Sequence, residues 1–175
     1  MSSPKSLIFV IDTSAIFNRI QYTAEDIPLA TTPLIENEMQ QKGLKDTIDL
    51  LVATQKLRII TPSTASLAKI QKVASQLGDL PYLSEPDQQL LALALDLLAQ
   101  NFSPILITDD YSIQNVAHRL SLEHKGTNQP GIREVLTWET YCSACGHKAP
   151  DLIKEKACPI CGTALTRRAI RKERI

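Results

Sequence analysis

The chain has 175 residues, 43% of them hydrophobic, and a formal net charge of zero, which is typical of a globular protein with a substantial core. No apolar run suits a signal peptide or a membrane span: "LIFVI" ends at Asp12, and "LLALALDLLA" is short and contains Asp96. We therefore expect a soluble, cytoplasmic protein without a membrane partner, built as one domain or one domain with a small appendage.

Strand-like and helix-like segments alternate through the first part of the chain. Short apolar or β-branched runs predict strands at 7–11, 29–32, 57–62, 104–108 and near 121–126. Apolar residues at helical spacing, with caps such as Thr32-Pro33, predict helices over 13–19, from 33 onward, and over 44–56, 63–77, 84–100 and 111–120. This alternation predicts a three-layer α/β/α domain with a mostly parallel sheet over residues 1–126.

The remainder of the chain begins at a polar segment with Gly and Pro, residues 124–131. We expect a linker and connecting strand over 127–138, a cysteine module over 139–165, and a basic tail or helix over 166–175. Residues 1–141 hold 11 Lys and Arg against 16 Asp and Glu, whereas residues 142–175 hold 8 against 3. An acidic body with a basic end indicates an anionic partner for that end.

Acidic residues follow two of the predicted strands. Asp12 ends the first strand, and Asp109 and Asp110 end a later one. Ligands of open parallel sheets bind at the carboxyl ends of strands, which favours a functional role for these acids. Aspartate is also a preferred N-cap, so capping of the next helix is an equally good interpretation of each acid taken alone.

Two further acids lie on the apolar faces of predicted helices. Glu38 shares a face with the preceding apolar residues, whereas Glu36 points the other way. Asp87 precedes Leu90 and Leu91 by three and four residues, although Ser84-x-x-Asp87 also resembles a capping box. We interpret Asp96 as structural or surface-exposed.

Four acids can therefore converge at one end of the sheet: Asp12, Glu38, Asp87 and Asp110. Two like charges about 4 Å apart repel by roughly 4 kcal/mol at an effective dielectric near 20, so such a cluster needs cations or protons. Oxygen ligands select hard ions such as Mg²⁺ or Mn²⁺. These ions are suited to attack of water on a phosphodiester.

The four cysteines form two CxxC pairs, Cys142/Cys145 and Cys158/Cys161, each followed by glycine. This spacing predicts one structural Zn²⁺ held by four thiolates. The module has too few residues to form a core without metal, so zinc should supply most of its stability. A closed site with four cysteine ligands has no open coordination position and is therefore not catalytic.

Several motifs together resemble a known family. "VIDTSAIF", "TTPLIENEM", "LSEPDQQLLALAL" and "LITDDYSIQNV" look like the four acidic motifs of a PIN-domain ribonuclease. Joined to "GIREVLTW" and a zinc ribbon, they resemble the archaeal and eukaryotic Nob (Nin one binding) endonucleases over essentially the whole chain. The resemblance implies a PIN fold over 1–126, one or two catalytic Mg²⁺ or Mn²⁺ ions, and cleavage that matures the 3′ end of small-subunit (16S-type) ribosomal RNA.

The resemblance also implies particular site residues. The first and third motifs place their acids at Asp12 and Asp87. In the second motif the acid is Glu38, with Glu36 as the alternative. The fourth motif has the form Thr-x-Asp, which selects Asp110 and leaves Asp109 as a cap, a neighbouring supporting group or an exposed residue.

Other polar residues are candidates for supporting roles. The hydroxyls of Thr13, Ser14 and Thr108 either orient carboxylates or a metal-bound water, or form ordinary hydrogen bonds at strand ends. The basic end is a candidate for contacting RNA phosphates, and its alternative is a solvated terminus. The candidates for RNA binding are Arg133, Lys148, Arg167, Arg168, Arg171 and Lys172. Stacking of bases on Tyr111, Tyr141 or Trp138 is a further hypothesis, against simple packing.

The resulting hypothesis is a metal-dependent endoribonuclease that acts on single-stranded precursor rRNA by two-metal hydrolysis. Its expected partners are that RNA, the nascent small ribosomal subunit and other assembly factors. The alternatives are a PIN-fold assembly factor that binds RNA without cutting it and a general toxin-type PIN ribonuclease.

Overall fold

The computed structural model describes residues 5–20, 26–128, 131–149 and 157–175. Its body contains a parallel sheet of five strands in the order β3-β2-β1-β4-β5. The strands are β1 (Ser6–Ile11), β2 (Leu29–Thr31), β3 (Leu57–Ile59), β4 (Phe102–Ile107) and β5 (Glu123–Lys125). The central strands β1 and β4 are covered on both faces, which explains their continuous apolar runs.

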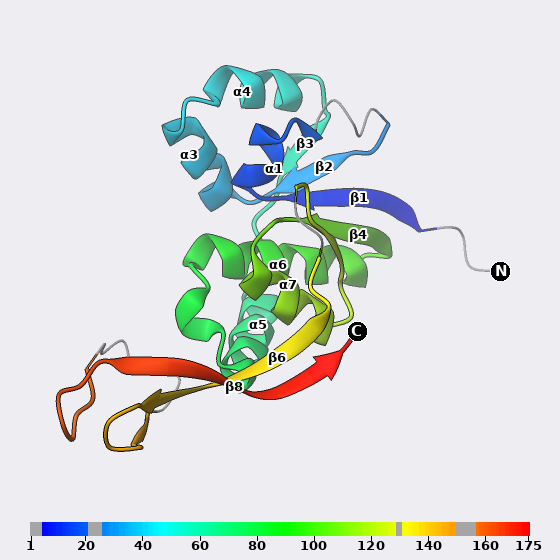
Figure 1. Ribbon diagram of the computed structural model, residues 1–175. Helices are drawn as coiled ribbons and strands as arrows, with labels where there is room; N and C mark the ends of the chain where they lie inside the picture. Colours follow the sequence, from blue (N-terminus) through cyan, green and yellow to red (C-terminus); the bar gives the residue numbers. More distant parts are fainter. Residues whose placement is uncertain (1–4, 21–25, 129–130, 150–156) are drawn as a thin grey trace.

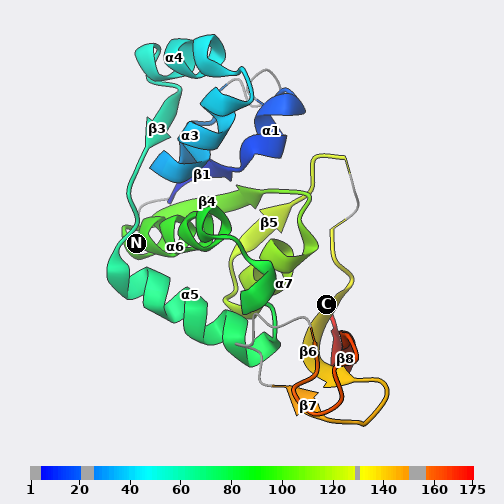
Figure 2. The same cartoon turned by 90° about the vertical axis from the view of Figure 1, so that its left-hand side faces the viewer.

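Helices cover both faces of this sheet (Figures 1 and 2). One face carries α1 (Thr13–Phe17), α3 (Pro33–Gln41) and α4 (Lys45–Ala53). The other carries α5 (Thr64–Leu77), the short 3₁₀ helix η1 (Leu80–Tyr82), α6 (Glu85–Ala99) and α7 (Tyr111–Arg119). The predicted three-layer α/β architecture is confirmed. None of the helices in the described ranges is long and apolar enough to cross a membrane.

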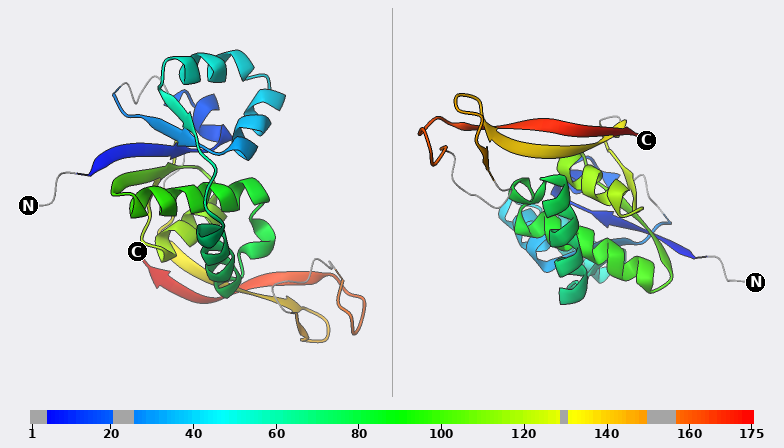
Figure 3. Two further views of the ribbon diagram at one scale, coloured as in Figure 1. Left: turned by 180° about the vertical axis from the view of Figure 1, so that it is seen from behind. Right: turned by 90° about the horizontal axis from the view of Figure 1, so that it is seen from below.

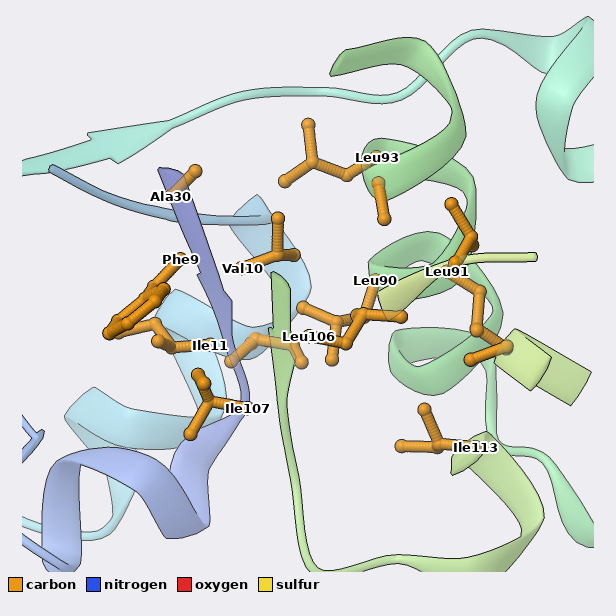
Figure 4. Close-up of a cluster of buried hydrophobic side chains, with 14 of the residues drawn as sticks. Phe9, Val10, Ile11, Ala30, Leu90, Leu91, Leu93, Leu106, Ile107 and Ile113 are labelled. Atoms are coloured by element: carbon orange, nitrogen blue, oxygen red, sulfur yellow. The ribbon is translucent and has the colours of Figure 1, made fainter. Parts of the chain in front are cut away.

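The main core lies between the sheet and α6 (Figure 4). Val10 and Leu106 from the sheet and Leu90 and Leu93 from α6 are fully buried. Burial of each such side chain contributes about 1.5–3 kcal/mol. Ile113 extends this core to α7. Packing therefore fixes the starts of α6 and α7 relative to the ends of β1 and β4.

The C-terminal part forms a long antiparallel hairpin with a short third strand, together called the hairpin, instead of a tail. Its three strands are β6 (Glu134–Cys142), β7 (Lys148–Ala149) and β8 (Leu165–Arg174), in the order β7-β6-β8. The prediction of a basic tail or helix over 166–175 is wrong, because this segment pairs with β6 over almost its whole length. The many charged residues of this segment give no strand-like sequence pattern. Its backbone hydrogen-bond partners lie on β6. The predicted boundary at residue 138 falls inside β6, and residues 129–130 and 150–156 lie outside the described residues.

Buried polar side chains on α7 attach the hairpin to the body. The Asn115 side chain accepts a hydrogen bond from the Leu136 N–H and donates one to the Leu136 carbonyl, both at 2.8 Å. The Gln114 amide donates to the Thr108 carbonyl at 2.8 Å, and its oxygen accepts from the Ile132 N–H at 3.0 Å. These bonds join the start of β6 to the helix that follows β4.

Arg167 on β8 makes a second attachment. Its guanidinium pairs with the buried Asp79 and donates to the Gly78 carbonyl at 3.0 Å. It also lies between two aromatic rings, 4.0 Å from the Tyr82 centroid and 4.1 Å from that of Trp138. The prediction that Arg167 presents its charge to RNA is therefore corrected: this side chain is mostly buried and holds the hairpin against the body. The cysteine-bearing end of the hairpin projects beyond the body (Figure 3).

Gly78 allows this close approach. It ends α5 with φ +70°, and a Cβ at this position would lie 2.6 Å from the Trp138 carbonyl oxygen. We expect Gly78→Ala to lower the free energy of unfolding by about 2–5 kcal/mol, because it adds a steric clash to a left-handed backbone. Gly43→Ala is the matched control, since Gly43 has φ +83° but open space around it, and should cost only about 1–2 kcal/mol. Urea unfolding followed by circular dichroism measures both, and equal losses would contradict the expectation.

Candidate active site and zinc site

Asp12 and Asp110 lie at the same edge of the sheet. β1 and β4 pair in register to their last residues, so the two chains leave the sheet side by side. Asp12 then caps α1, and its Oδ1 accepts from the Ala15 N–H at 2.9 Å. Asp110 caps α7 in the same way, with Oδ1 accepting from the Ser112 N–H at 2.6 Å.

Asp87 approaches from the first turn of α6. Its Oδ2 accepts from the Ser84 N–H at 2.8 Å and the Ser84 hydroxyl at 2.7 Å, which completes the capping box suggested by the sequence. Burial raises the pKa of Asp87, and the hydrogen bonds from Ser84 oppose this rise. The negative charges of Asp110 and Asp12 raise the pKa further. Three of the four predicted acids therefore lie within electrostatic range of one another.

Capping leaves part of each carboxylate available to another partner. Asp12 and Asp110 use Oδ1 for their caps, and Asp87 uses Oδ2. The other oxygen of each accepts no hydrogen bond from a described residue. The two interpretations of these aspartates, helix cap and metal ligand, are thus compatible, because each role needs one oxygen.

Glu38 differs from these three acids. Its helix, α3, packs against both α1 and α6, between the elements that carry Asp12 and Asp87. The Glu38 carboxylate pairs with Lys42 on the next turn, and its side chain is 38% exposed. Glu36, the alternative in the sequence, accepts a hydrogen bond from the Gln40 amide at 3.0 Å. The structure thus places Glu38 on a helix beside the aspartates, with its charge offset by a neighbouring lysine.

The predicted supporting hydroxyls lie around the aspartates. The Ser14 hydroxyl donates to Asp12 Oδ1 at 2.7 Å, and the Thr108 hydroxyl accepts from the Asp110 N–H at 3.1 Å. The Thr13 hydroxyl is buried and has no hydrogen-bond partner among the described residues. A buried hydroxyl without a partner is costly, which suits a position where water or another ligand completes the site.

Asp109 has a different role from its neighbour Asp110. Its Oδ1 accepts from the backbone N–H of Thr127 at 2.8 Å and that of Asn128 at 3.3 Å, and its Oδ2 accepts from the Thr127 hydroxyl. The Asn18 amide at the end of α1 donates to the same carboxylate at 3.5 Å. Asp109 thus fastens the segment after β5 to the end of α1, next to the candidate active site.

Asp79 is an acid near the site that sequence reasoning missed. Burial raises its pKa, hydrogen bonds from Asn115 and Arg167 oppose that rise, and the charge of Asp110 adds to it. Asp79 has an exposed fraction of only 1%. A buried charged group commonly marks a functional or anchoring position, but nothing in the local sequence reveals its burial.

The four cysteines come together at the far end of the hairpin. All four Sγ atoms lie within 4.8 Å of one another, and the Cys142–Cys161 and Cys145–Cys158 separations are 3.4 and 3.6 Å. Tetrahedral Zn–S bonds of about 2.3 Å imply sulfur separations near 3.8 Å. The predicted donor set therefore has the chemistry and the spacing that zinc requires.

Two similar turns present these sulfurs. The Cys142 N–H donates to the His147 carbonyl at 2.8 Å, and the Gly146 N–H donates to the Cys142 carbonyl at 3.0 Å. Cys158 and Gly162 repeat the same pattern in the second turn. Gly146 and Gly162 have positive φ angles, which permit these tight turns.

Neighbouring groups shift the pKa values of two of the thiols in opposite directions. The His147 backbone N–H is the largest single influence on the Cys145 thiol and lowers its pKa. Desolvation and the three neighbouring thiols outweigh it, so that the pKa rises to about 12. The pKa of Cys161 is lowered to about 6, and hydrogen bonds with Thr163 are the largest cause. Among the described residues, this quartet is the one His, Cys, Asp or Glu group of three or more already close enough to hold an ion.

Comparison with known proteins identifies the family. Residues 9–97 match the model for the PIN domain of ribonuclease. This chain belongs to the PIN-domain ribonuclease family. It is 32% identical to Endoribonuclease Nob1 of Pyrococcus abyssi over 157 residues, which cover 90% of this chain and 91% of the relative. It is 34% identical to Endoribonuclease Nob1 of Methanocaldococcus jannaschii over 162 residues, covering 93% and 78%.

A third relative carries a different name. Ribonuclease VapC1 of Thermoplasma acidophilum is 34% identical over 161 residues, covering 92% of this chain and 78% of the relative. All three names describe ribonucleases, and the family resemblance drawn from the motifs is confirmed. The chain is an endoribonuclease of the PIN type, and PIN nucleases use divalent metal ions.

The basic residues of this PIN ribonuclease fall into two groups. Glu139 pairs with Lys148 at 2.7 Å and with Arg168 at 2.8 Å, and Glu173 pairs with Arg171 at 2.9 Å. These are exposed pairs, which contribute little to stability and leave the cations accessible. Arg133 and Lys172, by contrast, form no ion pair with a described residue.

Removal of one cysteine ligand should abolish tight zinc binding. We expect one zinc ion per wild-type chain, and a loss of zinc affinity of at least about 100-fold in Cys161→Ser, because even outer-shell changes cost about 10–100-fold. Competition with a chromophoric chelator measures this affinity. Ser143→Ala, in the first turn, should retain wild-type affinity. Unchanged zinc affinity in Cys161→Ser would show that the quartet is not a zinc site.

Divalent ions should stabilise the body through the aspartates. Mn²⁺ at one hundred times its Kd should add about 2.7 kcal/mol to the free energy of unfolding of the wild type. Asp110→Asn should lose most of this gain, because asparagine retains the cap but not the charge. Asp49→Asn, on the exposed surface of α4, should keep it. Thermal unfolding with and without Mn²⁺ tests this, and equal shifts in the two variants would exclude Asp110 as a ligand.

Proposed function

We propose that this PIN endoribonuclease cuts single-stranded precursor RNA of the small ribosomal subunit to produce its mature 3′ end. The reaction takes place in the cytoplasm, on the nascent subunit. Support comes from the relatives named Endoribonuclease Nob1, which match at least nine-tenths of this chain. The observation that carries the proposal is the convergence of Asp12, Asp87 and Asp110, each with one uncommitted carboxylate oxygen.

The proposed chemistry rests on how these residues are held. Asp12, Asp87, Asp110 and Glu38 would hold one or two Mg²⁺ or Mn²⁺ ions, which would activate a water and neutralise charge on the phosphate. Helix caps fix the aspartates before RNA arrives, so little reorganisation is needed. The oxygen of water joins phosphorus and the P–O3′ bond breaks, which leaves 5′-phosphate and 3′-hydroxyl ends.

Glu38 completes the set by exchanging partners. Its carboxylate is now neutralised by Lys42, one turn along α3. A divalent ion held by the aspartates would attract this carboxylate more strongly than an exposed lysine does, because exposed ion pairs contribute only about 0–1 kcal/mol.

The hairpin contributes attraction for RNA. Lys148, Arg168, Arg171 and Lys172 are exposed along it, Lys148 toward the zinc-bearing end and Arg171 and Lys172 nearer the body. Contacts with phosphates act without regard to sequence and weaken as salt concentration rises. The hairpin thus serves to hold the precursor rRNA, while the acids cut it.

Cleavage of a defined RNA tests the proposal. The wild type with Mn²⁺ should cut a single-stranded substrate spanning the rRNA 3′ end at one position. Asp12→Asn and Glu38→Gln should each lower kcat/KM by about 100-fold or more, since loss of a direct ligand should cost at least as much as loss of an outer-shell partner. Glu36→Gln, on the same helix as Glu38, is the matched control and should remain active.

The same assay separates the two alternatives. Binding without any cleavage would indicate an assembly factor that only docks RNA. Equal cleavage of unrelated single-stranded RNA would indicate a general ribonuclease, as the similarity to Ribonuclease VapC1 allows. Either outcome contradicts specific maturation of rRNA.

A further inference from the structure

A cleft of about 780 Å³ lies where the hairpin meets α7. One wall is the first turns of α7, and the other is the face of β6 and β8 that carries Leu136 and Trp138. Figures 1 and 2 show these strands passing beside α7 on the side of the body away from β1. Its volume is in the range of sites that bind small organic ligands, such as one nucleotide.

The cleft adjoins the candidate active site. Tyr111 and Ser112 line it, and they directly follow Asp110 at the start of α7. Asp79 lies in its wall, close enough to Asp110 that the charge of Asp110 raises its pKa. The cleft therefore lies next to the proposed metal ligands.

The lining combines aromatic rings with uncommitted cations. Arg133 and Arg174 are exposed at the cleft, and neither forms an ion pair with a described residue. Trp138 contributes an indole ring, already stacked on the guanidinium of Arg167 at 4.1 Å. Glu134 is the one exposed or half-exposed acid in the lining, directly across the ladder from Arg174.

The ladder explains why the cations on β8 differ. In the strand register, Arg168 lies opposite Glu139 and Arg171 lies opposite Thr137. On this face Arg168 forms an ion pair with Glu139, and Arg171 forms one with Glu173. The register shift between Thr137 and Trp138 leaves Ile170 unpaired in the ladder, which puts Arg168 and Arg171 on one face although three positions separate them; Arg174 lies opposite Glu134 on the other face. The hairpin thus turns its neutralised cations to one side and Arg174 toward the cleft.

We propose that this α7–hairpin cleft binds one nucleotide of the single-stranded RNA next to the scissile phosphate. The base stacks against Trp138 and Tyr111, and the flanking phosphates bind Arg133 and Arg174. Stacking on aromatic side chains beside a cationic groove is the general way in which proteins bind single strands without reading sequence. The inference rests on the proposed ribonuclease function, and it adds the site that selects unpaired RNA.

Trp138 is the only tryptophan in the chain and therefore reports on the cleft directly. The experiment titrates zinc-loaded full-length protein with a single-stranded RNA hexamer in the absence of Mg²⁺ and Mn²⁺. We expect saturable quenching of tryptophan fluorescence. A hexamer with abasic sugars should bind without quenching, and adenosine monophosphate should bind at least tenfold more weakly than the RNA hexamer because it has one phosphate.

Loss of both cations should weaken the RNA complex. The Arg133→Ala/Arg174→Ala double variant should bind at least tenfold more weakly, and the slope of log K against log salt should become less negative by about 1.4, two phosphates at about 0.7 each. Arg58→Ala, on the exposed β3 edge of the body, removes one positive charge away from the cleft and should bind like the wild type. Zinc content and circular dichroism confirm that the variants fold.

Two outcomes would overturn the proposal. One is binding seen by fluorescence anisotropy without any change in Trp138 emission, which would place the RNA elsewhere. The other is a double variant that binds as tightly as Arg58→Ala. Neither outcome depends on cleavage. Quenching without cleavage under Mn²⁺ would refute the nuclease role but support nucleotide binding in the cleft. Cleavage without quenching would support the nuclease role but refute nucleotide binding in the cleft.

Discussion

The parallel pairing of β1 with β4 determines where two of the candidate acids lie. Both strands are buried, and six paired positions fix their register through Ile11 and Ile107. The chain leaves both strands at one edge, so that Asp12 and Asp110 emerge as neighbours although 98 positions separate them. A shift of one residue in this ladder would turn every core side chain to the opposite face, so core packing and the active site select the same register.

The carboxylates that cap helices are the same ones proposed to hold the catalytic metal. An aspartate N-cap contributes about 0.5–2 kcal/mol, and a negative charge at a helix N-terminus about 0.3–1 kcal/mol. Two charges 4 Å apart repel by roughly 4 kcal/mol at an effective dielectric near 20. Caps alone therefore do not offset a tight cluster of acids. A divalent cation held by the acids would offset the remaining repulsion.

The sequence predicted the parts of the structure that local patterns encode. Alternating strands and helices, the cap at Ser84 and Asp87, and the spacing of the cysteines each depend on residues close together in the chain. The prediction that failed was β8, because a strand with charged residues on both faces has no apolar alternation. Its partners lie on β6, which begins more than thirty residues earlier. Arg167 shows the same limit, since its partner Asp79 is 88 positions away.

The attachment of the hairpin to the body depends on contacts between residues that are distant in the chain. Asp79 is buried, and desolvation raises its pKa even beside Arg167. A buried ion pair of this kind adds little net stability compared with apolar packing, but removal of one partner commonly costs about 3–5 kcal/mol. Such a contact therefore favours one orientation of the hairpin over others rather than the folded state in general. Because Asn115 binds both Asp79 and Leu136, the orientation of the hairpin is set by the same helix that Asp110 caps. α7 itself thus fixes the position of the hairpin relative to the acids.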